Sequence, residues 1–263
     1  MIGLFLGGTD FPSFILKKLK KKRKKYFIID LTKKNLFKKY KNSYFISIGK
    51  FGEILKLIHD KKCKKVLFAG KIEKPKISNL KLDFKGFYYL PRIIKAFKLG
   101  DAAILKELIN ILNENKIKVV KSNFFNPELT LNKGTYTKLK PTLIDLKEIG
   151  LGLKYLKKLS PYNHTQAVIV RNNKVIKKET SRGTKKMIEK TIRNEQKNGI
   201  LIKFPKKKQD LRADLPTIGF DTLMDCKKAN LKGIVLKSKE NIFLDQKKSI
   251  YFANKNKIFI HIL

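Results

Sequence analysis

Short apolar runs alternate with helical patterns along the first half of the chain. Strands are expected at residues 2–6, 26–30 and 66–69, where four or five mostly apolar residues follow one another. Between them, the apolar residues of segments 12–25 and 51–60 recur at helical spacing. Such alternation is typical of a parallel sheet covered by helices on both faces. We therefore expect a Rossmann-like N-terminal domain.

The second half combines a hairpin with further strands and helices. Residues 167–170 and 175–179 flank Asn172-Asn173, and asparagine accepts the positive φ of a tight hairpin turn. Because a hairpin is antiparallel, we expect a mixed sheet here. The other expected elements are helices at 92–115 (interrupted near Gly100), 143–159, 183–197 and 221–230, and strands at 119–120, 200–204, 233–236, 242–244 and 258–262.

The length of 263 residues allows one large or two ordinary domains. Residues 126–136 are irregular and rich in turn formers, so the boundary is expected there. The prediction is an α/β chain with a Rossmann-like parallel sheet at 1–130, a linker at 131–142 and a mixed-sheet catalytic domain at 143–263. A cleft is expected between the two domains.

The charge balance is strongly basic, with 62 Lys and Arg against 21 Asp and Glu and a net charge of +41. Clustered cations favour nucleic-acid backbones, so a basic nucleic-acid-binding protein without catalysis is the alternative to an enzyme. Only six of these residues are arginine, which is the usual choice for bidentate recognition of bases and phosphates. The lysines are spread over every segment, as expected from a drift of the coding sequence towards A·T-rich codons. Because arginine is rare and the lysines are not clustered, we expect no nucleic-acid partner. A basic surface still favours anionic substrates and anionic membrane faces.

Membrane-spanning and secretory signals are not evident in the sequence. The apolar start precedes the first lysine, Lys17, whereas a secretory signal carries its charge first. Cys63 and Cys226 lie far apart and form no metal-binding or disulfide spacing. These features indicate a cytoplasmic protein.

The most informative segment is 209–219, Gln-Asp-Leu-Arg-Ala-Asp-Leu-Pro-Thr-Ile-Gly. Asp210 and Asp214 offer the hard oxygen ligands that divalent cations prefer, and Arg212 can hold phosphate oxygens. Lysines at 203, 206, 207 and 208 add positive charge upstream. Together they indicate chemistry on a phosphate ester or anhydride, while a solvated polar turn is the alternative interpretation.

Two further positions carry candidate chemistry. Gly7-Gly8-Thr9 follows the first strand and opens a helix, where free amides can hold an anion. Asp30 ends the second strand as in dinucleotide-binding folds, but the Gly-x-Gly-x-x-Gly spacing is absent. A nucleotide or sugar group, or a purely structural turn, is therefore preferred there to a nicotinamide cofactor. Glu179 ends a predicted strand and can be a metal ligand, a substrate contact or an exposed strand end.

These segments together resemble the UDP-2,3-diacylglucosamine pyrophosphatases of the LpxI type, which act in lipid A biosynthesis. The resemblance is colinear along nearly the whole chain, and its most specific piece is the loop around Asp214. Its motifs are Gly7-Gly8, Gly49-x-Phe51-Gly52, Phe68-Ala69-Gly70, Leu90-Pro91-Arg92, Gly100-Asp101, Pro127-Glu128-Leu129-Thr130, Gln166-Ala167-Val168, Glu179, Gly183-Thr184 and residues 209–219.

The resemblance implies cleavage of the pyrophosphate of UDP-2,3-diacylglucosamine to UMP and lipid X, with Mg²⁺ or another divalent cation. Asp214 is the expected central carboxylate, aided by Asp210 and Arg212, and Asp214 and Glu179 are the expected metal ligands. The expected substrate contacts are Gly7, Gly8, Thr9, Gln166, Lys203, Gln209 and Thr217. The expected partners are the lipid-linked UDP-sugar, the inner-membrane surface through peripheral contact, and a second copy in a homodimer.

The chain departs from the family beside Gly183-Thr184. Acids usually flank this pair, whereas here Arg182 precedes it and Lys185 follows it. If those acids helped to hold the metal, this protein holds it differently or less tightly.

Overall fold

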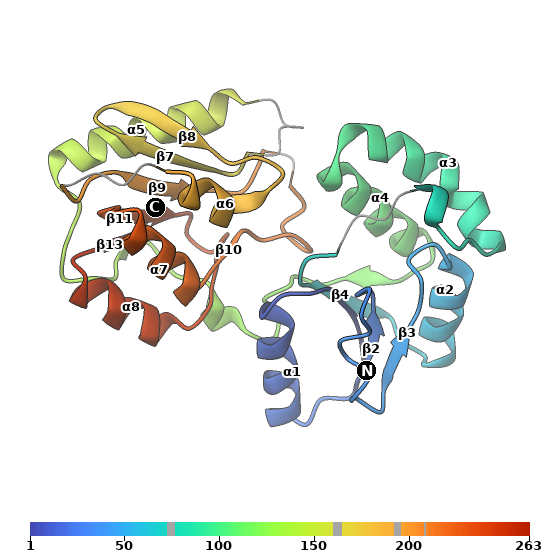
Figure 1. The fold of residues 1–263 in the computed structure, drawn as a ribbon. Coiled ribbons are helices and arrows are strands. Elements are labelled where there is room, and N and C mark those ends of the chain that lie inside the picture. The colour runs from blue at the N-terminus through green and yellow to red at the C-terminus, as the bar shows by residue number, and fades with distance from the viewer. Residues whose placement is uncertain (73–76, 160–164, 192–195, 208) are drawn as a thin grey trace. The chain divides into compact units, whose positions relative to one another are not determined.

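The computed structural model describes the chain except for residues 73–76, 160–164, 192–195 and 208 (Figure 1). Lys208 and residues 192–195 of the helix predicted at 183–197 thus lie outside the described residues, and the helix itself ends at Glu189, earlier than predicted. The chain forms two compact units. The first contains Met1–Pro127 and Asp210–Asp214, and the second contains Glu128–Gln209 and Leu215–Leu263. The segment predicted as a linker, 131–142, belongs to the second unit.

A five-stranded parallel sheet forms the centre of the first unit, as far as the structure describes it. Its strand order is β3-β2-β1-β4-β5, the order of a doubly wound nucleotide-binding fold. The predicted Rossmann-like sheet is confirmed. The strands are β1 (Ile2–Leu6), β2 (Tyr26–Asp30), β3 (Ser43–Phe45), β4 (Lys65–Ala69) and β5 (Lys118–Val119).

The helices of the first unit are α1 (Phe11–Lys21), α2 (Phe51–Asp60), α3 (Phe84–Leu99) and α4 (Asp101–Glu114), with a 3-10 turn at Ile77–Asn79. The predicted break near Gly100 separates α3 from α4, but α3 begins eight residues before the predicted start at Arg92. Asp83 caps it, because its carboxylate accepts the Gly86 backbone N–H at 2.8 Å. Pro91 lies inside α3 and is why the sequence pattern placed the start too late.

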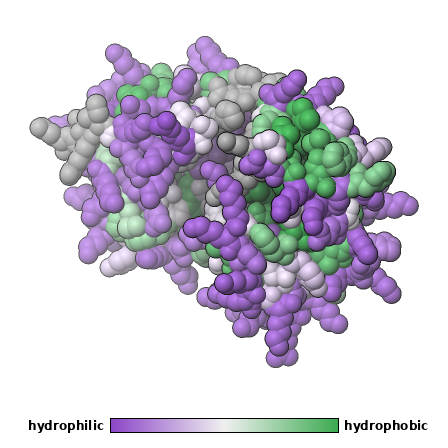
Figure 2. All heavy atoms as spheres, turned by 45° about the vertical axis from the view of Figure 1, so that its right-hand side comes forward, coloured by the Kyte–Doolittle hydropathy of each residue, from purple (hydrophilic) through white to green (hydrophobic). Residues whose placement is uncertain are grey.

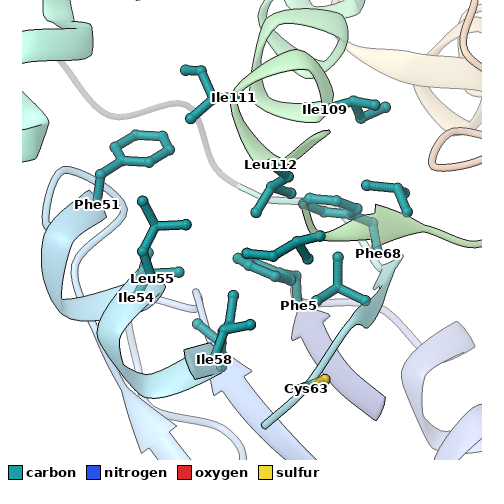
Figure 3. Packing of buried hydrophobic residues seen from close by; sticks show 14 of the residues in the cluster. Phe5, Phe51, Ile54, Leu55, Ile58, Cys63, Phe68, Ile109, Ile111 and Leu112 are labelled. Atoms are coloured by element: carbon teal, nitrogen blue, oxygen red, sulfur yellow. The ribbon is translucent and has the colours of Figure 1, made fainter. Parts of the chain in front are cut away.

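One part of the core of the first unit lies between its sheet and the helices α2 and α4 (Figure 3). Phe5 of β1 and Phe68 of β4 stack with ring centroids 4.7 Å apart. Ile58 of α2 and Ile109 of α4 are almost completely buried in the same cluster. The apolar face of α4 is therefore part of this core. Ala213, from a distant part of the sequence, also packs against this cluster.

The second unit contains a six-stranded mixed sheet within the described residues. Its order is β6-β13-β11-β9-β7-β8; β9, β11 and β13 are mutually parallel, whereas β6, β7 and β8 pair antiparallel with their neighbours. The predicted mixed sheet is confirmed. Its strands are β6 (Gly134–Thr135), β7 (Ala167–Arg171), β8 (Lys174–Lys178), β9 (Ile200–Lys203), β11 (Gly233–Leu236) and β13 (Phe259–Ile262), and β10 (Thr217–Ile218) pairs separately with β12 (Ile242–Phe243).

The turn between β7 and β8 has the predicted geometry, because Asn172 and Asn173 have φ angles of 51° and 55°. Gly152 brings its helix close to the sheet, since a Cβ there would lie 2.3 Å from the Ile202 side chain. The helices of this unit are α5 (Leu143–Lys158), α6 (Gly183–Glu189), α7 (Phe220–Lys228) and α8 (Gln246–Lys255), with a 3-10 turn at Pro127–Leu129 where the two units join. No described helix is long and apolar enough to cross a membrane.

Candidate functional site

Residues 210–214 form a loop that belongs to the first unit although its flanking residues belong to the second. Ser122, just beyond β5, anchors the loop, because its backbone N–H and its Oγ both donate to the Arg212 carbonyl, at 2.7 and 3.1 Å. Ser122 is buried, and Ala213 packs on the core of the unit. The loop predicted to carry the chemistry is thus held by hydrogen bonds to its main chain and by the packing of the Ala213 side chain.

Asp210 organises this loop from within. Its carboxylate accepts the Arg212 backbone N–H at 2.9 Å, Nε at 3.0 Å and Nη2 at 2.6 Å. Its carbonyl oxygen accepts the backbone N–H groups of Ala213 and Asp214, at 3.1 and 3.0 Å. One residue therefore sets the direction of the Arg212 side chain and the main-chain position of Asp214.

The electrostatics of the loop follow from this pairing. The hydrogen bonds from Arg212, opposed by burial, hold the pKa of the Asp210 carboxyl below its ordinary value, and Lys106 of α4 adds to this effect. The bond to Asp210 also raises the pKa of the Arg212 guanidinium. The Asp210 side chain is 14% exposed and that of Arg212 43% exposed. The arrangement presents a fixed guanidinium to solvent, with the half-buried Asp214 two residues away.

The glycine turn after β1 has one residue that packing explains and one that it does not. A Cβ on Gly7 would lie 2.4 Å from the Lys71 carbonyl oxygen, so the close approach of two backbones requires glycine there. A Cβ on Gly8 would meet only Leu36 at 3.8 Å, an ordinary contact. Gly8 and Thr9 are exposed between the ends of β1 and β4, where ligands bind in doubly wound folds.

Asp30 has a structural role that disfavours the dinucleotide interpretation. Its carboxylate is fully buried and accepts the Thr32 N–H and Oγ1–H, at 2.8 and 2.6 Å, and the Phe37 N–H at 2.9 Å. These bonds fix the loop after β2. The acid that would hold a ribose in dinucleotide-binding folds is committed to the protein's own backbone.

A buried polar cluster lies in the second unit, where β9 ends and β7 begins. Lys203 Nζ donates to Thr184 Oγ1 at 2.8 Å and to the Thr217 carbonyl at 3.1 Å. Thr184 Oγ1 in turn donates to Glu179 Oε1 at 2.6 Å, and the Gln166 backbone N–H donates to Glu179 Oε2 at 3.1 Å. Four residues predicted as site residues, namely Gln166, Glu179, Lys203 and Thr217, are therefore brought together in one network.

Thr184 joins this network although it was not among the predicted site residues. Its signal in the sequence was the Gly183-Thr184 pair at a helix start; Gly183 has a φ of +86°, which glycine adopts without strain. Arg182 and Lys185 stand beside the pair as exposed cations. Gln209, predicted as a substrate contact, is buried, and its Oε1 accepts the Lys206 backbone N–H at 2.9 Å.

The fit of these residues to a divalent cation is uneven. Glu179 already has a donor on each carboxylate oxygen, which disfavours it as a metal ligand, and Asp210 is committed to Arg212. The described parts of the chain contain no group of three or more His, Cys, Asp and Glu side chains placed to hold an ion. Asp214 is the remaining predicted ligand. Mg²⁺ usually takes one or two protein carboxylates together with waters and substrate phosphates, so a single carboxylate would hold it only with such additional ligands.

The fold and its polar groups define a two-domain α/β protein with a doubly wound first domain and a mixed-sheet second domain. Family comparisons narrow this class. The LpxI N-terminal domain matches residues 1–129 and the LpxI C-terminal domain matches residues 132–261. The chain belongs to the LpxI family, and the resemblance found in the sequence is confirmed.

A curated relative supports the same assignment. The chain is 29% identical over 223 residues to the UDP-2,3-diacylglucosamine pyrophosphatase LpxI of Caulobacter vibrioides. These matched residues make up 82% of this chain and 80% of that protein. The similarity therefore extends over most of both proteins rather than over one shared motif.

Proposed function

We propose that this protein hydrolyses the pyrophosphate of UDP-2,3-diacylglucosamine to UMP and lipid X in lipid A biosynthesis. The observation that carries the proposal is the match of both LpxI domains along the chain, at 1–129 and 132–261. The name of the relative from Caulobacter vibrioides supplies the reaction. A water oxygen adds to the sugar-side phosphorus, and the bond from this phosphorus to the bridging oxygen breaks. The bridging oxygen leaves as part of UMP, and the proton released from water goes to solvent.

The Arg212 guanidinium of the first unit suits an anionic diphosphate. Negative charge grows on the leaving phosphate oxygen, and a fixed cation there lowers the barrier without having to reorganise. Arg212 meets this requirement, because Asp210 holds its guanidinium while nearly half of its side chain remains exposed. We propose that Arg212 contacts the diphosphate and that Asp210 acts as its positioning residue.

Lys203 supplies positive charge on the second unit. Its ammonium is held by Thr184 and the Thr217 carbonyl, so its position is set before substrate binds. We propose that Lys203, Thr184 and Glu179 form one positioning network for a substrate phosphate. Gly8 and Thr9 are proposed to contact the uridylyl or sugar part at the turn after β1.

A divalent cation is part of the proposal, with Asp214 as its protein ligand and substrate phosphates completing the set. When bound, such an ion neutralises charge on the phosphate oxygens. Glu179 is left out of the ligand set, because both of its oxygens already accept hydrogen bonds.

The decisive experiment follows release of UMP from the UDP-linked substrate dispersed in detergent. The wild-type protein should release UMP with Mg²⁺ and lose this activity with EDTA. Asp214→Ala should lower the rate by about a hundredfold or more at an unchanged circular dichroism spectrum. Asp221→Ala, which removes an exposed acid from α7, is the matched control and should keep full activity.

Normal UMP release by the Asp214→Ala variant would contradict the assigned role of Asp214. Absence of hydrolysis by the wild type, with tight and steeply salt-dependent binding to any duplex, would favour the alternative suggested by the net charge of +41.

We also propose that the protein works at the cytoplasmic face of the inner membrane through peripheral contact. The proposed substrate carries two acyl chains and lies in that membrane, while the basic surface attracts anionic headgroups.

A further inference from the structure

The outer face of α3 exposes three aromatic side chains. Phe84 is 89% exposed, Phe87 64% and Tyr88 70%. Their spacing of three and four residues places them on one side of the helix. Tyr89 and Ala96, on the opposite side, are buried against the unit. The exposed rings therefore form a separate aromatic surface on α3 and are not part of the core that its other side contacts.

Exposed lysines accompany these rings. Lys85 lies on the first turn of α3, and Lys95 and Lys98 continue along its second half. α3 contains no acidic residue. We call Phe84, Phe87, Tyr88, Lys85, Lys95 and Lys98 the α3 patch. Figure 2, which turns the α3 side of Figure 1 forward, shows hydrophobic surface over this helical part, bordered by hydrophilic side chains.

The helix that carries the α3 patch is held firmly from behind. Arg92 donates through Nε to Glu107 at 2.6 Å and through Nη1 and Nη2 to Glu114 at 2.8 and 2.6 Å, which joins α3 to α4. The Asp83 carboxylate caps α3 through Gly86 and also accepts the Glu53 backbone N–H of α2 at 2.9 Å. The exposed face is thus preformed, and docking requires no folding of the helix.

The charge of the α3 patch distinguishes two candidate partners, a second copy of this chain and an anionic bilayer. A second copy of this chain brings another +41 and its own lysines, which repel those of the α3 patch. An anionic bilayer attracts them, since each lysine near such a surface contributes favourably and aromatic rings settle at the level of the headgroups. We propose that the α3 patch is the docking surface of this protein for an anionic lipid bilayer.

The α3 patch lies outside the residues assigned to the reaction, so the docking proposal stands or falls separately from the proposed function. In the expected mode, the rings enter the boundary between headgroups and acyl chains, and the lysines contact lipid phosphates. Docking would bring an enzyme of a membrane-borne substrate to the surface where that substrate lies.

Flotation with lipid vesicles tests the proposal, using the full-length purified protein. Vesicles of phosphatidylglycerol and phosphatidylethanolamine should bind it, and vesicles of pure phosphatidylcholine should bind it at least about tenfold less. The double variant Phe84→Ser, Phe87→Ser should lose about tenfold or more of its partition onto anionic vesicles. Lys95→Gln with Lys98→Gln should lose a similar factor and become less sensitive to salt.

A matched control removes apolar surface from another exposed helix. Leu143 and Ile144 of α5 are 79% and 63% exposed, and Leu143→Ser with Ile144→Ser should bind anionic vesicles as the wild type does. Circular dichroism and thermal unfolding should be unchanged in all three variants. Hydrolysis of substrate dispersed in detergent should also be unchanged in the α3 variants, while hydrolysis of substrate in vesicles falls with their binding.

Unchanged vesicle binding of Phe84→Ser, Phe87→Ser would overturn the proposal, as would an equal loss in the α5 control. Light scattering that shows a dimer, dissociated by the same α3 variant, would instead make the α3 patch a surface for self-association. If the wild type binds vesicles through α3 but hydrolyses no substrate, the docking surface stands and the proposed function fails.

Discussion

Asp210→Asn tests whether the 210–214 loop is positioned as the structure indicates. The substitution keeps the size of the side chain but removes the charge that pairs with Arg212 through Nε and Nη2. The amide oxygen can still accept the Arg212 backbone N–H, so the turn itself should survive. The substitution instead removes the ion pair that orients the Arg212 guanidinium.

The effect on stability should be small. The Arg212 side chain is 43% exposed, and an ion pair with such access to water contributes about 1 kcal/mol or less. The effect on activity should be much larger, because a misplacement of about 1 Å in a group that contacts the transition state can cost about a hundredfold in rate. We therefore expect Asp210→Asn to lower UMP release by about that factor while the midpoint of thermal unfolding hardly moves.

The assay compares UMP release at saturating substrate for the wild type, Asp210→Asn and the exposed control Asp221→Asn. Because its folded-state pKa is lowered, the Asp210 carboxylate keeps its charge above its ordinary pKa, and the pairing is lost only as pH falls through the lowered value. The difference between the wild type and Asp210→Asn should thus persist from about pH 5 to pH 8. A rate for Asp210→Asn within about threefold of the wild type would refute the idea that Asp210 positions Arg212.

Two further predictions concern the second unit. Lys203→Met removes the ammonium but keeps the stem, and it should reduce UMP release by about a hundredfold, whereas Lys203→Arg, measured in parallel, should restore part of it. Asp145 is buried on α5 and paired with Lys232; burial raises the pKa of its carboxyl, but the bonds from Lys232 and Thr142 outweigh it and lower the pKa. Its contribution to stability should be complete above its ordinary pKa and lost as pH falls through the lowered value, so urea unfolding between about pH 3 and pH 7 should show stability declining below about pH 4. Lys232→Met should flatten this decline; an unaltered pH profile would contradict the pairing.

Sequence patterns predicted the fold wherever local signals and tertiary packing agreed. The strand at Tyr26–Asp30 and the hairpin around Asn172-Asn173 correspond to the structure because their apolar runs and turn residues act locally. The helix α8 was missed, since its buried residues include the small Ser249 and Ala253 and give only a weak apolar stripe. The start of α3 was placed too late because Pro91 normally excludes a helix interior.

The candidate site was predictable in its residue types but not in its connections. Carboxylates beside an arginine in 209–219 pointed to phosphate chemistry without any coordinates. That Asp210 is committed to Arg212 and Glu179 to Thr184 depends on directions of side chains that no spacing reveals. Ser122, which holds the loop from about ninety positions earlier in the chain, left no signal in the sequence at all.

The return of residues 210–214 to the first unit has a consequence for how the protein is made. A ribosome completes the segment up to Pro127 long before it reaches Arg212, and domains generally fold as they emerge. Until then the hydroxyl of Ser122 lacks its acceptor, and the apolar surface that Ala213 covers stays open to water. The first unit can therefore complete its packing only after residues 210–214 have been synthesised. This segment, which completes the first unit, also contains Asp214.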